Sequence, residues 1–306
     1  MTSVDISIIL VNYNTVRLTV DCIDSIFSFT HNVRFEVIVV DNASTDGSKE
    51  LFEKDDRIQY IYEEKNHGFG KANNIGASLA KGNYLFFLNS DTLLYENAIF
   101  DLFNFLENNR DAIICGGNLV SKDKLPTSSF ERIYPSISYV LNELFLKIPG
   151  KIIFGKNTCY NYTRKPIEVA YVSGADLMIL TETFMAINGF DERFFMYYEE
   201  TDLCKRASKL GKIYSIPSAH IIHFGGQSSK DSPKLPSNKK LSIQHDSACL
   251  YFSKHYSTFY IWIYSLLRTI TNYSRYFQFI IVGNKDKADL WKRVIDINHK
   301  KNKEEL

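Results

Sequence analysis

The first 120 residues alternate short apolar runs with segments of helical length, and this alternation constrains the fold most. Between the apolar runs lie helical patterns at 18–29 and 71–79. Strand and helix in alternation predict βαβ units around a parallel sheet. Strands covered on both faces are apolar throughout, as these runs are. The sequence therefore predicts an α/β fold with a mostly parallel central sheet flanked by helices, its strands at 6–11, 35–40, 58–62, 84–88 and 112–115.

Composition excludes several classes of protein. The chain has 306 residues, 45% hydrophobic and 23% charged, which is typical of a globular protein. Its net charge of +1 gives no electrostatic case for nucleic-acid binding. The five cysteines are scattered without a CxxC pair, so neither a disulfide framework nor a zinc site is indicated. Since the sequence enters a strand directly, without a leader pattern, we expect a cytoplasmic location.

The rest of the chain divides into four stretches. Residues 121–167 contain four prolines and are interpreted as a variable insertion near the acceptor side. Order returns over 168–228, with a strand-like pattern at 169–180 and a helical one at 199–210. Residues 229–240 are polar with two prolines, which predicts a mobile loop, and 241–306 form a helical region. The predicted boundaries are therefore a domain at 1–228, the loop, and a C-terminal appendage.

The C-terminal region carries an amphipathic aromatic helix. Its apolar residues recur at spacings of three and four, from Phe259 and Trp262 through Phe277 and Ile280. The apolar run between His255 and Arg268 has only 12 residues, short of the roughly 20 that span a bilayer. Two interpretations stay open: the helix docks on the sheet domain, or it lies in a membrane interface, peripherally on the inner face of the plasma membrane.

Polar clusters follow three of the predicted strands. The first strand ends in Val11-Asn-Tyr-Asn14, the second in Asp41-Asn-Ala-Ser-Thr-Asp46-Gly-Ser48, and the fourth in Asn89-Ser-Asp91. Turn and helix-cap chemistry explains any one of them alone. Three clusters at the same edge of one sheet favour a ligand site, because ligands bind beyond the carboxyl ends of parallel strands.

Carboxylates at this edge suit a nucleotide diphosphate. Asp41 could accept hydrogen bonds from a base edge or a ribose, and Asp91 could offer a hard oxygen to Mg²⁺ or Mn²⁺. Such a cation stabilises the charge that collects on a leaving diphosphate. The loop 66–76 has glycines before a helix, but matches neither GxGxxG nor GxxxxGK[ST], so it gives no support to a dehydrogenase or a P-loop enzyme.

These motifs, in this order, resemble the inverting family 2 glycosyltransferases with the GT-A fold. The resemblance rests on VNYN, VDNASTDGS, NHGFGKANNIG and LNSDT, and continues through Gly174-Ala-Asp176, the run from Gly189 to Arg206, and His223-Phe-Gly-Gly-Gln-Ser228. It covers about residues 4–228. The later motifs look most like the rhamnosyltransferase branch, whose members build bacterial surface polysaccharides.

The resemblance implies a role for each matching residue. The nucleotide pocket would be lined by Val11, Asn12, Tyr13, Asn14 and Asp41, with Asn66, Gly70 and Asn73 on the base and ribose side. Asn89, Ser90 and Asp91 stand where the family often has Asp-x-Asp. Because Asn replaces the first Asp, metal ligation is assigned to Asp91, with His223 as the second ligand and Asn89 and Ser90 kept as donor contacts.

The pair Glu199-Glu200 matches an acidic pair whose second member is the catalytic base in the family. An inverting transfer needs one base to take the proton of the acceptor hydroxyl. We therefore predict Glu200 as the base, with Glu199 and Asp202 as alternatives, although acids in a first helical turn also suit the helix dipole alone. Asp176 and the aromatic segment 194–198 are the acceptor-side candidates.

The sequence predicts a transferase that moves a sugar, L-rhamnose from dTDP-rhamnose, to a hydroxyl of a glycan or lipid-linked acceptor. Alternatives are a UDP-sugar donor, or a catalytically silent sugar-nucleotide-binding or scaffold subunit, which Asn89 and the aromatic helix motivate. A nucleotidyltransferase would need a Gly- and Arg/Lys-rich loop after the first strand, where this chain has Asn-Tyr-Asn-Thr-Val-Arg. A homodimer is compatible with the sequence, and no nucleic-acid partner is expected.

Overall fold

The computed structural model describes residues 4–225 and 236–304. The chain divides into two compact units. The first, here called the sheet unit, comprises Met1–Arg132, Lys156–Phe195 and Glu199–Ser232. The second, here called the helical unit, comprises Ile133–Gly155, Met196–Tyr198 and Pro233–Leu306. The sequence did not predict that residues 133–155 belong with the C-terminal helices.

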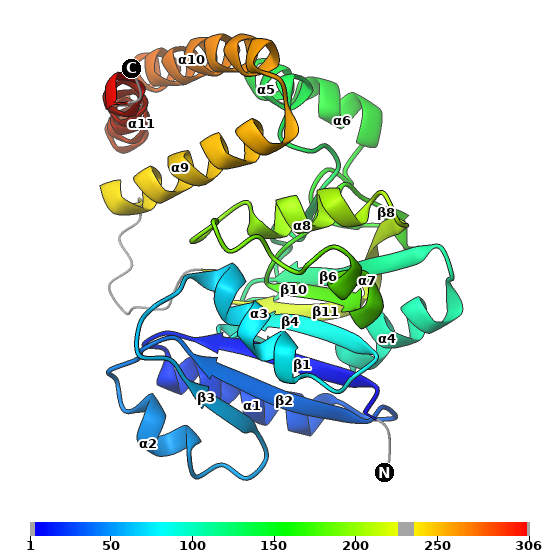
Figure 1. Cartoon of the computed structure of the whole chain (residues 1–306). Helices are drawn as coiled ribbons and strands as arrows, with labels where there is room; N and C mark the ends of the chain where they lie inside the picture. The colour runs from blue at the N-terminus through cyan, green and yellow to red at the C-terminus, as the bar shows by residue number, and fades with distance from the viewer. Residues whose placement is uncertain (1–3, 226–235, 305–306) are drawn as a thin grey trace. The chain divides into compact units, whose positions relative to one another are not determined.

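The sheet unit is built on a nine-stranded sheet with the order β3-β2-β1-β4-β10-β6-β11-β5, and with β8 paired to β11 (Figure 1). The strands of this sheet are β1 (Ile6–Asn12), β2 (Phe35–Asp41), β3 (Gln59–Tyr62), β4 (Tyr84–Asn89), β5 (Thr92–Leu94), β6 (Ala112–Val120), β8 (Ile167–Glu168), β10 (Asp176–Leu180) and β11 (Lys212–His223). A separate pair joins β7 (Phe130–Glu131) to β9 (Tyr171–Val172). The predicted strand at 169–180 is thus two strands in different sheets.

The predicted parallel pairing holds for half of the sheet. Strands β3, β2, β1 and β4 run parallel, which confirms the βαβ pattern of the first 90 residues. Beyond β4 the sheet is mixed, because β10 lies antiparallel between β4 and β6, whereas β11 is parallel to β6. Strands β5 and β8 are antiparallel to β11.

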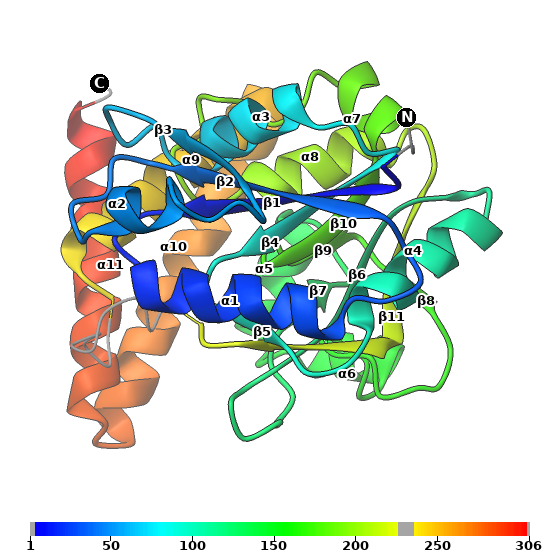
Figure 2. The same ribbon diagram turned by 90° about the horizontal axis from the view of Figure 1, so that it is seen from below.

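Helices cover both faces of the sheet (Figure 2). Alternate strand residues such as Ile8 and Leu10 pack with α1 and α4 into the main core. On the other face lies α3, where a Cβ built on Gly76 would come within 2.6 Å of the Ile9 side chain. A glycine is therefore required for α3 to sit this close to β1. The helices of this unit are α1 (Val16–Phe29), α2 (Ser48–Phe52), α3 (Phe69–Leu79), α4 (Ala98–Asn108), α7 (Thr181–Ala186) and α8 (Glu199–Ala207).

The carboxyl ends of the parallel strands meet at one edge, as predicted. Asn12 at the end of β1 is in register with Asp41 at the end of β2, and Val11 is in register with Asn89 at the end of β4. The chain then turns back into β5, whose Thr92 pairs with His223 at the end of β11. This antiparallel pairing brings a histidine distant in sequence to the same edge.

The helical unit contains α5 (Ile137–Leu144), α6 (Ile148–Phe154), α9 (Asn238–His255), α10 (Thr258–Ile281) and α11 (Lys285–Glu304). Arg268 of α10 donates to the Glu143 carboxylate of α5 at 2.5 Å, and Tyr256 donates to the Pro135 carbonyl at 2.8 Å. These contacts explain why 133–155 joins the C-terminal helices. Of the predicted loop 229–240, residues 229–235 lie outside the described residues. The rest differs from the prediction, because Ser237 caps α9 and 238–240 are helical.

Candidate functional site

Asp91 and His223 lie together at the carboxyl edge of the sheet. The Asp91 Oδ1 and the His223 Nε2 are 3.3 Å apart, and the Asn89 amide nitrogen lies 3.4 Å from the same ring nitrogen. Asp91 is 7% exposed. The backbone holds the pair, since the Phe224 N–H donates to the Asp91 carbonyl at 3.0 Å beside the Thr92–His223 pairing. The structure thus brings together both residues that were predicted as metal ligands.

The donors of this cluster are suited to a divalent cation. A carboxylate oxygen, an imidazole nitrogen and, with its amide turned, the Asn89 carbonyl oxygen converge on one point. The two oxygen donors suit Mg²⁺ or Mn²⁺, the imidazole nitrogen suits Mn²⁺ better than Mg²⁺, and either ion takes several further oxygens from phosphate or water. Among the described residues no group of three or more His, Cys, Asp or Glu side chains forms a metal cluster. A cation held here would therefore depend on a ligand to complete its coordination.

Asn12 and Asp41 are the centre of a buried hydrogen-bond network and do not face solvent. Both are 0% exposed. The Asn12 side-chain amide nitrogen donates to Asp41 Oδ2 at 3.1 Å, and the Asn12 Oδ1 accepts from the hydroxyls of Thr15 and Thr19. Asp41 also accepts from the Ser44 N–H at 2.8 Å and from the Tyr60 hydroxyl at 3.0 Å. In this structure the network fixes the loops that follow β1 and β2, a role that the sequence did not assign to Tyr60.

The exposed members of the first cluster are Tyr13, which is 49% exposed, and Asn14. Asn14 has a φ of 55° and accepts from the Thr45 N–H at 2.8 Å, which ties the two loops together. Val11 is half-buried, and Ser90 is 9% exposed with its hydroxyl 3.2 Å from that of Thr15. Tyr13 and Asn14 are therefore the residues of this cluster that a ligand can reach directly.

The loop 66–70 is shaped by Asn42, a residue that lies in the second polar cluster but was not selected as a site residue. Asn42 is 2% exposed, donates to Asn66 Oδ1 at 3.0 Å and to the Gly68 carbonyl at 3.1 Å, and accepts from the His67 N–H. Asn66 also accepts from the Gly68 N–H at 2.9 Å. Asn73 is 1% exposed and donates to the Phe69 carbonyl, so it stabilises α3 from within.

Two glycines bring this loop against the segment before the acidic pair. Gly68 has a φ of 83°, and a Cβ there would lie 2.2 Å from the Phe195 carbonyl oxygen. The neighbouring Phe69 N–H donates to the same oxygen at 2.9 Å. A Cβ on Gly70 would lie 3.6 Å from the Cβ of Glu199. The predicted donor loop and the start of α8 are therefore in direct contact.

Helix α8 begins with the acidic pair Glu199-Glu200, and the two carboxyl groups lie in different environments. Glu199 is 6% exposed, and its Oε2 has no hydrogen-bond partner in the described part of the chain. Burial, and then the neighbouring Glu200 carboxylate, raises the pKa of Glu199 well above its ordinary value. Glu200 is half-buried, and burial raises the pKa of its carboxyl as well. Of the two, Glu200 is the one a substrate can reach.

Glu200 is connected to the cluster of Asp91, His223 and Asn89 through residues 174 and 175, which directly precede β10. A Cβ on Gly174 would lie 3.5 Å from the Glu200 Cβ, and the carbonyl of the next residue, Ala175, accepts from the Asn89 N–H at 3.0 Å. The residues before α8 are also unusual, because Tyr197 and Tyr198 have φ values of 70° and 67°. Left-handed backbone at two bulky residues is strained and is concentrated at functional sites.

Two predicted site residues lie inside the protein. Asp202 is 0% exposed and pairs with Arg206 at 2.7 Å, while Arg206 also donates to the Gly189 carbonyl. Asp176, predicted on the acceptor side, is 0% exposed and accepts from the Gly117 N–H at 2.7 Å. Burial raises its pKa well above the ordinary value. Both side chains are fully buried, so neither carboxylate is exposed to solvent in this structure.

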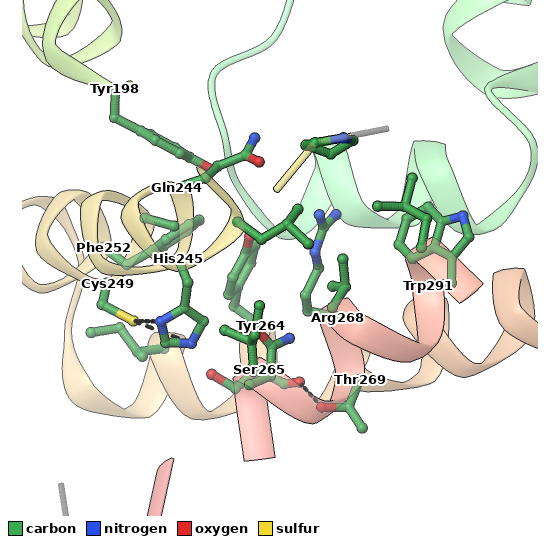
Figure 3. A pocket seen from close by; sticks show the side chains of 18 residues that line it. Tyr198, Gln244, His245, Cys249, Phe252, Tyr264, Ser265, Arg268, Thr269 and Trp291 are labelled. Carbon is green, nitrogen blue, oxygen red and sulfur yellow. Dashed lines mark hydrogen bonds between the residues drawn. The ribbon is translucent and has the colours of Figure 1, made fainter. Parts of the chain in front are cut away.

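A cavity of about 370 Å³ lies in the helical unit, among α9, α10 and α11 (Figure 3). Its wall combines apolar side chains such as Phe252 and Trp291 with the polar groups of Gln244, His245 and Arg268. The lining includes Tyr198 from the aromatic segment predicted on the acceptor side, and none of the predicted catalytic, donor or metal residues.

Comparison with known proteins identifies the family. A model described as "Glycosyl transferase family 2" matches residues 7–167, just over half of the chain. The chain belongs to glycosyl transferase family 2. The matched residues carry the ends of β1, β2 and β4, and therefore Asn12, Asp41 and Asp91. The motifs around Glu200 and His223 lie outside the matched range.

Relatives of this family-2 chain are named glycosyltransferases. It is 27% identical to rhamnosyltransferase WbbL of Escherichia coli (strain K12) over 62% of the chain and 73% of that protein. It is 29% identical to the low-salt glycan biosynthesis hexosyltransferase Agl10 of Haloferax volcanii, over 67% of the chain and 62% of Agl10. It is 33% identical to glycosyltransferase GlyG of Streptococcus pneumoniae over 39% of the chain, and spans only 40% of GlyG.

Solved structures share the fold at low sequence identity. The structure of GalNAc-T7 with UDP, GalNAc and Mn²⁺ matches 81% of the chain with a TM-score of 0.53 and 15% identity, over 48% of that protein. The structure of TarS from S. aureus matches 81% of the chain with a TM-score of 0.51 and 18% identity. The fold is thus the GT-A glycosyltransferase fold, as the sequence predicted.

Proposed function

We propose that this chain transfers a glycosyl group from a nucleoside diphosphate-sugar to a hydroxyl acceptor, with inversion at the anomeric carbon. The observation that carries the proposal is the convergence of Asp91, His223 and Asn89 at a sheet edge that Glu200 approaches through Gly174. Membership of family 2 and relatives named as glycosyltransferases support it.

In the proposed mechanism Glu200 is the general base. Its carboxylate takes the proton of the acceptor hydroxyl as that oxygen attacks the anomeric carbon on the face opposite the diphosphate. The raised pKa of Glu200 makes it a stronger base than an exposed glutamate. Burial and the neighbouring Glu200 carboxylate raise the pKa of Glu199 well above its ordinary value, and Glu199 is less exposed than Glu200, so Glu200 is the better placed of the two to act as the base.

The diphosphate would be held at Asp91 and His223, with Asn89 beside them. When a divalent cation is bound there, it neutralises the charge that develops on the departing diphosphate. Tyr13 and Asn14 are the exposed groups of the strand-β1 loop and would contact the nucleotide, while Asn12, Asp41, Asn66 and Asn73 hold the surrounding loops in place. The GalNAc-T7 structure, which contains UDP and Mn²⁺, supports the cation.

For the donor we propose dTDP-L-rhamnose, and for the acceptor a glycan or lipid-linked glycan in cell-surface polysaccharide synthesis. Support comes from the identity to WbbL, which is named a rhamnosyltransferase, and to TuaG of Bacillus subtilis, named a putative teichuronic acid biosynthesis glycosyltransferase. A UDP-sugar donor is the alternative with the same chemistry.

The test is a panel of sugar nucleotides incubated with the protein, Mn²⁺ or Mg²⁺, and candidate acceptors. Transfer or donor hydrolysis with dTDP-rhamnose, abolished in Glu200→Gln while donor binding persists, is the expected result. Absence of binding to every sugar nucleotide would contradict the proposal.

A second candidate is a catalytically silent sugar-nucleotide-binding subunit. It is favoured by Asn89 in place of an acid and by a cation site of only two charged or imidazole ligands among the described residues. Donor affinity that is unaffected by a chelator, together with no turnover, would support this candidate over the enzyme.

A further inference from the structure

The helix α10 of the helical unit has a long apolar face that is exposed to solvent. Here this face is called the α10 stripe, and its members recur at spacings of three and four. From Phe259 to Ile281 it covers 23 residues and extends about 33 Å, at 1.5 Å for each step along the helix. An uncovered apolar patch of this length is rare on a soluble surface and marks a binding surface. The residues of the stripe, with exposed fractions between 38% and 84%, are Phe259, Trp262, Leu266, Ile270, Tyr273, Phe277, Ile280 and Ile281.

Apart from Tyr273, whose hydroxyl lies 3.1 Å from the His299 Nε2 of α11, the stripe points away from the side-chain bonds that fix α10 in its unit. Tyr260 accepts from the Ile137 N–H, and Arg268 and Arg275 both bond to Glu143 of α5. Residues 260, 268 and 275 project from the side of the helix opposite the stripe, since each residue advances by about 100°. The stripe therefore plays no part in holding α10 to α5, although it is the most apolar face of the helix.

The charge of the two units indicates what could cover the stripe. The helical unit has 15 Lys and Arg residues against 7 Asp and Glu, a formal charge of +8, while the sheet unit has 21 against 28, a charge of −7. The helix α10 contains two arginines and no acidic residue. At the end of the helix, the exposed Ile281 and Val282 are followed by the exposed Lys285 and Lys287, with the exposed Asp286 between the two lysines. The net charge of +1 for the whole chain hides this separation.

We propose that the α10 stripe docks the chain on the surface of an anionic lipid bilayer. The helix lies in the plane of the interface with its aromatic and aliphatic side chains among the acyl chains, while basic side chains of the helical unit meet anionic headgroups. Trp262 and Tyr273 have the amphipathic rings that favour this depth. In the part of the chain that the structure describes, no helix has both the length and the hydropathy of a membrane span, so the contact is peripheral.

A second copy of the chain fits the stripe less well. A two-fold contact through α10 would place two units of charge +8 against each other, with no acidic side chain on the helix to compensate. An anionic bilayer has a charge opposite to that of the helical unit. The inference does not depend on the proposed function, because it concerns binding to lipid and is measured without any donor or acceptor.

The test is co-sedimentation of the full chain with lipid vesicles. Vesicles of phosphatidylcholine are compared with vesicles containing about 30% phosphatidylglycerol, at low salt and at about 0.5 M NaCl, where surface charges are screened. We expect binding to the anionic vesicles that is at least about tenfold stronger than to the neutral ones and that weakens with salt. Equal binding to both vesicles would overturn the proposal, as would no binding to either.

A matched pair of triple variants locates the contact. Phe259→Ser, Trp262→Ser and Phe277→Ser remove side chains that are 72%, 63% and 55% exposed, so the fold should be retained. The control replaces comparably exposed side chains of the sheet unit, Leu51, Met185 and Leu210, by serine; these are 48%, 52% and 58% exposed. We expect the first variant to lose at least about tenfold in vesicle affinity and the control to keep it. Equal affinities would overturn the assignment to α10.

The tryptophans give an independent readout, because the chain has only two, Trp262 and Trp291. In Trp291→Phe the fluorescence comes from Trp262 alone, which should shift to the blue on anionic vesicles and be quenched by brominated acyl chains. An unchanged spectrum with bound vesicles would contradict insertion of the stripe. Dimerisation that the stripe variant abolishes, without vesicle binding by the native chain, would assign the stripe to a second copy and refute the proposal.

Discussion

Replacing Gly68 by alanine tests the contact between the donor loop and the segment before the acidic pair. Gly68 has a φ of 83° and a ψ of 179°, and an added Cβ would lie 2.2 Å from the Phe195 carbonyl oxygen. Gly47 is a matched control, since it also precedes a helix, with a φ of 87°, but has no atom within 4 Å of an added Cβ. Both substitutions strain the backbone, and only that of Gly68 forces another segment to move.

The magnitudes follow from the contacts. Gly47→Ala should cost about 1 kcal/mol of unfolding free energy for a left-handed alanine. Gly68→Ala should cost about 2 kcal/mol for its backbone conformation, which only glycine adopts readily. It should cost about 1 kcal/mol more for each of two hydrogen bonds that the shift weakens. These are the bonds from Phe69 N–H to Phe195 O and from Asn42 to the Gly68 carbonyl. The expected total for Gly68→Ala is therefore about 4 kcal/mol.

Urea unfolding of the two variants and the native chain measures this difference. Sugar transfer should also fall further in Gly68→Ala than in Gly47→Ala, because Phe195 lies four residues before Glu199. Losses of unfolding free energy that agree within about 1 kcal/mol for the two variants would refute the reasoning, because the contact with Phe195 would then not contribute to stability.

Three further outcomes are expected. Glu200→Gln should keep donor affinity within about threefold and lose at least about a hundredfold in transfer rate. The transfer rate of the native chain should rise with pH through the raised pKa of Glu200. Substantial transfer by the variant would place the base elsewhere. Asp176→Asn should gain stability relative to the native chain as pH rises above the ordinary pKa of Asp, by about 1.4 kcal/mol per unit of pKa shift, in urea titrations. A pKa of Asp176 that is raised in the folded state stabilises the native chain fully only at pH values below the pKa of this group in the unfolded chain. The native chain therefore loses this contribution as pH rises. A stability difference between the two chains that does not change with pH would contradict the raised pKa. Asp202→Ala should cost about 3 kcal/mol by leaving Arg206 unpaired, with native donor affinity in calorimetry; weakened donor binding in the folded variant would indicate a direct role.

The sequence was most informative where the chain is locally regular. The ends of β1, β2 and β4 were predicted to meet because parallel strands share one edge, and the register of Asn12 with Asp41 confirms it. The antiparallel insertion of β10 was not predictable from periodicity, because a short apolar run does not reveal its direction. The split of residues 133–155 from their neighbours rests on long-range contacts such as Glu143 with Arg268, which leave no local pattern.

For the candidate site, the motifs selected residues that the fold brings close together, such as Asp91 and His223, but they did not predict the burial of each side chain. Asp202 and Asp176 are fully buried. The motifs that contain them are polar, so the sequence pattern did not predict this burial. The difference between Glu199 and Glu200 likewise depends on how α8 packs against Gly70 and Gly174. Asn42 had a signal, since it lies inside the predicted cluster at 41–48, but only the fold shows that it holds the loop at 66–68.

The central claim is that Asp91 and His223 hold a cation for the diphosphate of a nucleotide sugar. Calorimetric titration of dTDP and UDP into the native chain and into Asp91→Ala, with Mn²⁺ and with a chelator, tests it most directly. We expect affinity of the native chain to fall at least about thirtyfold in chelator, and Asp91→Ala to bind weakly in both conditions. Equal affinity of the native chain with and without Mn²⁺ would contradict the claim.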